Sequence, residues 1–494
     1  MLKKSVPEAA LLLMLVLNSS AWATVHVELA CVAATSPPVN TALAYHGPAF
    51  EAAVAEANRL YRGLFEFTLS FMTGNGTSSV YENISVADEA LPMHTADWYY
   101  RSRRTFPNGI LAFITPGMAS STDILQLTAN WGILFVSTVG SRESSTTLPS
   151  PIYLGAAYVS TSDIGRMVIE FLQLFNWTTA FVVVDSNAPP VYKTMAVQAE
   201  KYASGTAIRI LKRTISLDLR PSYLAVLDEF VTMSRILVFL GRAEKLRKLL
   251  VEASVRNMTA GDFVYLWDEP YPYPPSYGNL SWSLPNDTDN SVAREAFRSL
   301  FVLGPYDLDE SSASSLITGQ LLLDQLRTRA LQTYRVPAGT PFTLPVRDVL
   351  TSYSTVLILA QVLNESLHED RLNCVSDAHW FLQQFLNRTF TIPGGFKVYV
   401  DPTGTRRVPL GLSHFAGPIP VRQIIYAQSS DDGFLMGQVG RVIPGRGSWP
   451  EKVWPPPSEP FCGHSGNRPT CNSASGLIHV KQQANHDKIE SNLI

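Results

Sequence analysis

Cysteine is scarce in this chain of 494 residues, which contains only four. Small secreted domains without a large core depend on several disulfides, so a chain this long with four cysteines must be held by its core instead. Cys462 and Cys471 enclose eight residues rich in Gly, Ser, Asn and Pro, where we expect a local disulfide. Cys31 and Cys374 either pair or stay free, because free cysteine is also among the most buried residue types.

Charged residues are also few, at 16% of the chain, whereas hydrophobic residues make up 46%. This composition predicts a folded globular protein and argues against long disorder. The 39 Lys and Arg residues nearly balance the 42 Asp and Glu residues, so the chain lacks the basic charge of nucleic-acid-binding proteins. We therefore expect no nucleic-acid partner.

The short motifs of common catalytic and cofactor sites are absent. There is no G-x-x-x-x-G-K-[ST] phosphate loop, no H-E-x-x-H zinc pair and no G-x-S-x-G nucleophile elbow. No histidine has a second ligand at a metal spacing, and acidic pairs such as Asp431-Asp432 lie in polar turns. We expect no enzyme activity, no cofactor and no metal. An extracellular hydrolase is an alternative, because a convergent triad needs no local motif.

What the sequence does contain begins at its amino terminus. Lys3-Lys4 precede a short apolar run at 9–17 and the small-residue pattern Ala21-Trp22-Ala23. This order predicts a secretory signal peptide over 1–23 that is cleaved after Ala23. An uncleaved membrane anchor is the alternative, but the run is shorter than the roughly 20 apolar residues that a bilayer span needs.

N-glycosylation sequons after the signal peptide agree with a secretory route. They begin at Asn75, Asn83, Asn176, Asn257, Asn279, Asn286, Asn364 and Asn387. We expect the protein to be secreted, or to lie on the extracellular face of the plasma membrane if the chain is a fragment of a longer receptor. Polar residues interrupt 472–494, so a membrane link would require a span that is not present in this chain.

Short apolar strands alternate with helical patterns along the mature part of the chain. Strands are expected at 25–31, 65–71, 110–114, 133–136, 180–184, 235–240, 263–266 and 301–303. A first helix is expected to begin with Pro48 in its first turn. Further helices are expected at 120–130, 162–175, 191–202, 244–256, 315–326 and 353–363, and a hairpin at 396–404. This order predicts an α/β protein with mainly parallel sheets flanked by helices. A mature length of about 470 residues favours two lobes. The Pro-rich composition of 268–290 predicts an exposed loop or an excursion between the lobes, and the end of the chain is Pro-rich and irregular.

A candidate ligand site lies where the strand at 110–114 leads into the helix at 120–130. Free N–H groups at a helix start favour an anion, and ligands of open α/β sheets bind beyond the carboxyl ends of strands. A small carboxylate or a chloride ion suits this place, although a serine here can also simply cap the helix. The candidate residues are Gly117, Met118, Ser120, Ser121 and Thr122, with Ser137, Thr138 and Ser141 on the next turn.

Ordered motifs then extend over nearly the whole mature chain. They are Gly47-Pro48-Ala49-Phe50-Glu51, Phe175-Asn176-Trp177, Ala293-Arg294-Glu295-Ala296-Phe297, Leu363-Asn364-Glu365-Ser366-Leu367, Asn387-Arg388-Thr389-Phe390, Gly394-Gly395-Phe396-Lys397-Val398, Asp401-Pro402-Thr403-Gly404-Thr405-Arg406, Trp454-Pro455-Pro456-Pro457 and Phe461-Cys462-Gly463 before Cys471. Their order resembles the extracellular ligand-binding region of natriuretic peptide receptors and receptor guanylyl cyclases, which has the periplasmic-binding-protein type I fold. We accordingly expect lobe 1 over about 24–140 and 300–393, lobe 2 over about 141–299 and 394–445, and a juxtamembrane-like tail over 446–494.

The resemblance also implies partners and a mechanism. It implies a bond between Cys462 and Cys471, a homodimer, and a peptide hormone or small extracellular ligand. Met118 stands where the family has a first-lobe cysteine beside a chloride site, although the amides of Gly117 and Met118 can still bind an anion. The leading hypothesis is a receptor domain that signals through a homodimer if it is joined to a membrane span. The alternatives are a clamshell receptor for an amino-acid-like carboxylate and a secreted decoy or clearance receptor.

Overall fold

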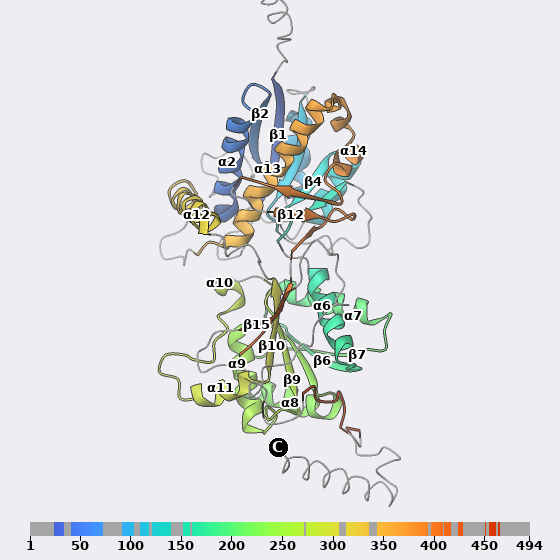
Figure 1. The fold of residues 1–494 in the computed structure, drawn as a ribbon, viewed down its shortest axis with the longest axis vertical. Helices are drawn as coiled ribbons and strands as arrows, with labels where there is room; N and C mark the ends of the chain where they lie inside the picture. Colours follow the sequence, from blue (N-terminus) through green and yellow to red (C-terminus); the bar gives the residue numbers. More distant parts are fainter. Residues whose placement is uncertain are drawn as a thin grey trace, which may run out of the picture.

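The computed structural model describes most of the chain. The described residues are 24–33, 41–72, 91–102, 109–117, 121–139, 152–158, 161–270, 273–305, 313–334, 343–393, 397–408, 410–415, 423–427, 450, 454–460 and 463–464. These residues form two α/β lobes placed one above the other along the longest axis (Figure 1). The predicted fold class is confirmed.

The first lobe contains a parallel five-stranded sheet in the order β2-β1-β3-β4-β5. Its strands are β1 (Val25–Val32), β2 (Phe65–Met72), β3 (Ile110–Thr115), β4 (Leu134–Ser137) and β5 (Tyr153–Gly155). The connecting helices are α2 (Leu43–Leu60), α4 (Leu91–Ser102) and α5 (Ser121–Asn130), and α2 is also covered by α12 (Ala313–Thr333) and α13 (Val346–His368). Residues 112–115 of β3 and all of β4 are buried because helices cover the sheet.

The second lobe contains a seven-stranded sheet in the order β15-β14-β10-β9-β8-β6-β7. The parallel strands are β6 (Thr179–Asp185), β7 (Arg209–Ile215), β8 (Ile236–Leu240), β9 (Val264–Asp268) and β10 (Leu300–Pro305), and the antiparallel ones are β14 (Leu410–His414) and β15 (Gln423–Ala427). Its helices are α6 (Thr161–Leu174), α7 (Pro190–Ala203), α8 (Arg220–Met233), α9 (Ala243–Val255), α10 (Pro274–Tyr277) and α11 (Asn290–Phe297). Every residue of β6, β8 and β9 is buried, as expected for central strands of a parallel sheet.

A small antiparallel sheet lies at the first lobe, near the connection between the lobes. It consists of β11 (Arg388–Thr391), β12 (Lys397–Val400) and β13 (Arg406–Arg407) and follows η4 (Leu372–Ser376) and α14 (Ala378–Gln383). Phe390, Val398 and Val400 enter the hydrophobic core of the first lobe. A bridge between Gly155 and Thr405 joins this sheet to the end of β5.

Some sequence expectations differ from the observed elements. Helix α2 begins at Leu43, so Pro48 lies inside the helix and not in its first turn. Burial of its apolar residues against α12 and α13 outweighs the helix hydrogen bond that a proline cannot donate. Strand β7 was not anticipated because it is a sheet edge, with Arg and Lys in place of alternating apolar residues.

The strand pairings also differ from the expected lobe boundaries. Strand β5 pairs with β4, so the first sheet continues to Gly155, beyond the expected change at 140. Strand β10 pairs with β9 in the second sheet, although 300–393 was assigned to the first lobe. An apolar run identifies a strand, but only long-range pairing decides which sheet the strand joins.

Helix α13 is long and apolar enough to cross a membrane by length and composition alone. In this structure 72% of its most apolar window is buried, and the helix packs against α2. It is therefore a core helix of the first lobe.

Candidate functional site

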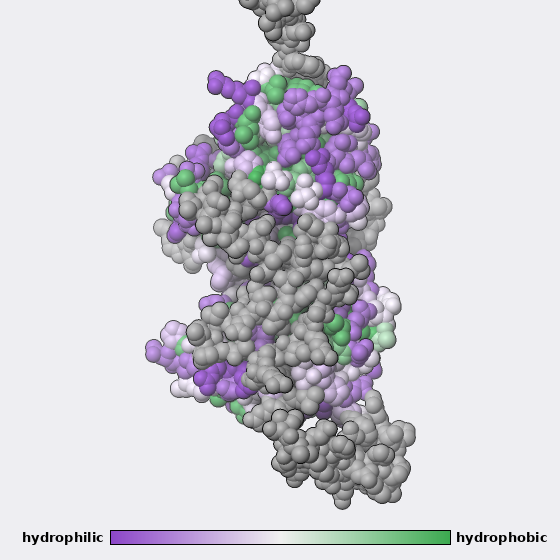
Figure 2. Space-filling view, in the orientation of Figure 1, coloured by the Kyte–Doolittle hydropathy of each residue, from purple (hydrophilic) through white to green (hydrophobic). Residues whose placement is uncertain are grey.

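The candidate site is the region where the carboxyl ends of both parallel sheets face the connection between the lobes. In the first sheet, β1 leads to β2 on one side while β3 leads to β4 on the other. In the second sheet, β6 leads to β7 while β8 leads to β9. Such points, where the strand order reverses, are where open α/β sheets bind ligands. The space-filling view shows a notch in the outline at the level between the lobes (Figure 2).

In the first lobe, the turn after β3 contains the predicted residue Gly117. Its amide donates to the side-chain oxygen of Thr115 at 3.0 Å, and its φ of +94° is in the left-handed region. A Cβ at this position would lie 2.6 Å from the carbonyl oxygen of Val139, so only glycine fits. Met118, Ser120 and Ser141 lie outside the described residues. Ser121 and Thr122 begin α5, and the positions of their side chains are not described.

Ser137 and Thr138, the other predicted residues, are buried at the end of β4. The Ser137 hydroxyl donates to the carbonyl of Val139 at 2.8 Å. The hydroxyls of Thr138 and Ser352 are 2.7 Å apart, and Ser352 lies 2.8 Å from Nδ1 of His46. These bonds join β4, α13 and α2, so the two hydroxyls contribute to the packing of the first lobe. Contact between a ligand and the hydroxyl of Ser137 or Thr138 remains a prediction.

The second lobe adds two buried polar groups that sequence reasoning missed. Asp268 ends β9 and is only 1% exposed, and no described group hydrogen-bonds to its Oδ1. Tyr192, in the first turn of α7, is fully buried, and its hydroxyl also has no hydrogen-bond partner among the described residues. The indole N–H of Trp267 donates to the carbonyl of Gly241 at 2.8 Å, so this donor does not satisfy the hydroxyl of Tyr192.

Burial raises the pKa of Asp268 well above its ordinary range. Burial and then the charges of Asp268 and Glu269 raise the pKa of Tyr192. An unsatisfied buried polar group costs about 1–3 kcal/mol, so this pair is suited to a bound polar group. A polar residue directly after an apolar strand was the signal that could have identified Asp268.

A second polar cluster at this edge is already satisfied within the protein. Lys245 contacts Asp185 at 2.9 Å and Asp218 at 2.8 Å. Burial lowers the pKa of Lys245, but hydrogen bonds to Asp218 and Asp185 outweigh it and raise the pKa overall. Asp185 also accepts from the amides of Asn187 and Leu217 at 3.3 Å. This cluster stabilises the loops after β6 and β7.

Ion pairs also connect the lobes. Arg407 of β13 forms ion pairs with Asp163 of α6 and, at 2.7 Å, with Asp401. Burial raises the pKa of Asp163, whereas Arg407 and Arg166 act to lower it.

The described residues contain no group of three His, Cys, Asp or Glu side chains arranged to hold a metal ion.

Two parallel-sheet lobes with polar groups at their facing edges define a two-lobed binding protein. A protein-family model described as the receptor family ligand binding region matches residues 46–407. The match runs from α2 to β13 and includes residues of both lobes, so the chain belongs to this family. No curated protein matches the chain.

Proposed function

We propose that this chain is the extracellular ligand-binding region of a receptor of the natriuretic-peptide-receptor type, and that it binds a peptide or another small signal. The observation that carries the proposal is the receptor-family match across both lobes. The ordered motifs support the subfamily: Phe175-Asn176-Trp177 leads into β6, and residues 401–405 form the turn between β12 and β13. A thermal-shift screen of peptides and small metabolites on the secreted protein tests this, because a ligand that binds only the folded state raises its stability.

The positions of the sequons support an extracellular location. Of the six in the described residues, five asparagines are exposed: Asn176, Asn257, Asn279, Asn286 and Asn387. Asn364 is half-buried on α13. Removal of N-glycans by an amidase should reduce the mass of protein secreted from animal cells and convert occupied asparagines to aspartate. Asn373, which is outside any sequon, is the internal control.

Signalling through a homodimer is the mechanism that we propose. A ligand that changes the angle between the lobes would also change the geometry of a dimer. Light scattering coupled to size exclusion measures the mass of the secreted protein with and without ligand. A protein that stays monomeric at micromolar concentration in both states excludes this mechanism.

Mapping of non-reduced peptides tests the proposed bond between Cys462 and Cys471, which lie outside the described residues.

The second candidate is a clamshell receptor for an amino-acid-like carboxylate. Asp268 and Tyr192 favour it, because their unsatisfied oxygens can accept hydrogen bonds from an ammonium group. In this proposal Ser121 and Thr122 of the first lobe hold the carboxylate. An amino acid that raises the melting temperature of the wild type should not do so for D268A, which removes both side-chain oxygens, or for S121A/T122A. If the amino acid raises the melting temperature of both variants as much as that of the wild type, this candidate is excluded.

A further inference from the structure

The Pro-rich segment near the end of the chain lies against the base of the second lobe. Trp454 contacts Phe175, which follows α6, Trp177, which precedes β6, and Phe301 of β10. The parallel strands β6 and β10 both begin here, so this sheet edge is opposite the edge with Asp268. Figure 1 shows the described part of this segment at the lower end of the second lobe.

Three aromatic side chains, Phe175, Trp177 and Phe301, contact the ring of Trp454, and we call the surface that they form the basal groove. The Trp454 ring centroid lies 5.0 Å from those of Phe175 and Phe301, and 5.8 Å from that of Trp177. The Trp454 ring stands edge-on to Phe175 at 74° and to Trp177 at 89°. These are the distances and angles that aromatic pairs prefer, so the fit is specific as well as apolar.

A buried hydrogen bond fixes Pro456, two residues after Trp454. The indole N–H of Trp177 donates to the carbonyl of Pro456 at 2.7 Å, and Trp177 is 1% exposed. An indole has one donor and no acceptor, so the carbonyl of Pro456 satisfies the only polar group of this side chain. An aromatic-lined groove with a donor to a main-chain carbonyl is the usual way that proteins bind Pro-rich segments, which lose little conformational entropy.

The end of α6 explains why two neighbouring aromatic residues can face one groove. The amide of Trp177 donates to the carbonyl of Leu172 at 2.9 Å, and that of Asn176 donates to Gln173 at 3.0 Å. These bonds define a Schellman motif, whose left-handed residue is Asn176 with φ of +55°. The exposed Asn176 therefore separates two side chains that contact the same ring.

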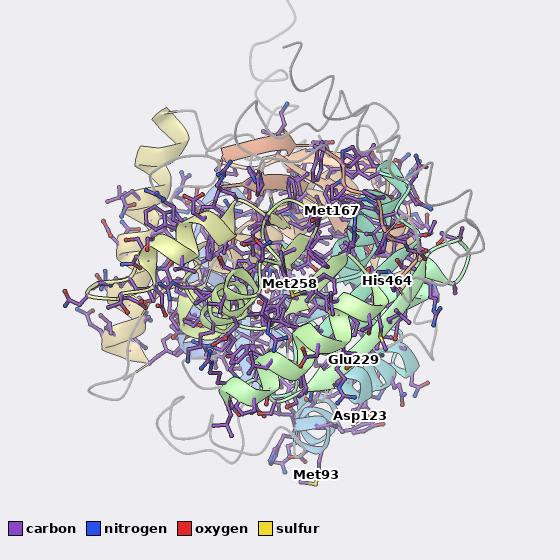
Figure 3. All side chains as sticks on the ribbon, turned by 90° about the horizontal axis from the view of Figure 1, so that it is seen from below. Met93, Asp123, Met167, Glu229, Met258 and His464 are labelled. Carbon is purple, nitrogen blue, oxygen red and sulfur yellow. The ribbon has the colours of Figure 1, made fainter. Side chains whose placement is uncertain are left out.

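Contacts continue along the base of the lobe after the prolines. The hydroxyls of Ser458 and Thr178 are 3.3 Å apart, and Nδ1 of His464 lies 3.3 Å from the carbonyl oxygen of Val231 on α8. Seen from below, His464 and Glu229 of α8 lie on the same side of the molecule (Figure 3). The described residues 454–460 and 463–464 thus lie at the second lobe.

We propose that the basal groove is an interaction surface for a Pro-rich segment, which this chain's own residues 454–458 fill. The bound segment fixes residues 454–460 to the second lobe, so that they move with this lobe and not with the first. A segment joined to the same chain has a high effective concentration and excludes a separate Pro-rich peptide. This proposal does not depend on which ligand the lobes bind.

Hydrogen exchange measured by mass spectrometry on the full chain tests the attachment. In W454A, exchange across 458–464 should accelerate by at least about 10-fold, since the main apolar contact is lost. In W177F, which keeps an aromatic ring but loses the donor to Pro456, it should accelerate by about 3- to 10-fold. W282F is the matched control, because Trp282 packs against a different core cluster of the same lobe. The proposal would be overturned if W454A exchanged over 458–464 at the same rate as the wild type, or if W282F accelerated this exchange as much as W454A.

A binding experiment tests the groove itself. A fluorescent peptide of residues 450–460 should bind W454A and should not bind the wild type, whose groove is filled. The double variant W454A/W177F should bind the peptide about 3- to 10-fold more weakly than W454A. Equal binding to wild type and W454A, or no binding to W454A at peptide concentrations up to about 1 mM, would contradict the proposal.

Discussion

The hydroxyl of Tyr273 donates a hydrogen bond to the hydroxyl of Tyr45 at 2.9 Å, across the two lobes. Tyr45 lies in α2 of the first lobe, and Tyr273 follows β9 of the second. Their rings meet edge to face with centroids 6.1 Å apart, and both side chains are buried. One hydrophobic cluster contains both tyrosines together with Val182 and Leu266 of the second sheet. The lobes are thus held in this arrangement by specific side chains as well as by the connecting chain.

Removing the Tyr273 hydroxyl should weaken the contact between the lobes. We expect Y273F to lower the free energy of unfolding by about 0.5–1.5 kcal/mol, since it deletes one buried hydrogen bond and keeps the ring. Urea denaturation measures this change. Y399F is the control, because its hydroxyl donates to Asn387 at 3.1 Å on the exposed surface, and it should cost less than about 0.5 kcal/mol. Equal effects would mean that the Tyr45–Tyr273 bond adds no stability of its own.

Gly117 should tolerate no side chain. We expect G117A to lower stability by about 2–5 kcal/mol, because its positive φ adds strain and the new Cβ meets a carbonyl oxygen. G132A separates these causes, since Gly132 has φ of +67° and nothing within 4 Å of the added Cβ. It should cost only about 1 kcal/mol. Similar melting temperatures for the two variants would contradict the close approach of Val139.

Thr138 provides a test that separates a structural role from a ligand contact. T138V keeps the side-chain shape but loses the hydroxyl that faces Ser352, so we expect the ligand-free protein to lose about 1–3 kcal/mol of stability. T138S keeps the hydroxyl and should be closer to the wild type. If T138V leaves the stability of the ligand-free protein unchanged and only reduces a ligand-induced shift, the hydroxyl serves the ligand and not the fold.

Asp268 should make stability fall as pH rises. Burial raises the pKa of Asp268 in the folded state, so above about pH 4, its unfolded value, the folded protein retains a proton that the unfolded chain releases. D268N removes this penalty, so its stability relative to the wild type should increase from pH 4 to pH 7.

Asp218 is the matched control for this pH dependence. Hydrogen bonds to Lys245 and Ser216 lower the pKa of the exposed Asp218 in the folded protein. The ionised carboxylate therefore stabilises the protein at pH values above the pKa of Asp218 in the unfolded chain, and this stabilisation is lost as pH falls. D218N should therefore lose stability relative to the wild type at pH 7 and match it at low pH. Melting temperatures measured from pH 3 to pH 7 test both variants. The same pH trend in both would contradict the assignment.

Much of the architecture could be predicted from local pattern. The runs that form β6, β8 and β9 are apolar and short, and they alternate with amphipathic helices, so the parallel sheets were predicted. The edge strand β7 and the short strand β5 gave no such signal. Of the predicted site, Gly117 occupies a turn that requires glycine, whereas the hydroxyls of Ser137 and Thr138 are bonded within the lobe.

The sequence by itself determined an α/β chain with sequons and a strand-to-helix turn around Gly117, and it predicts a secretion signal, because these depend on residues close together in the chain. The tertiary structure decided which strands share a sheet, and it brought His46 to Ser352 and Tyr45 to Tyr273. It also placed Trp454 against Phe301, 153 positions earlier in the chain (454 − 301). Contacts between such distant residues depend on how whole elements pack, and no local periodicity encodes that packing.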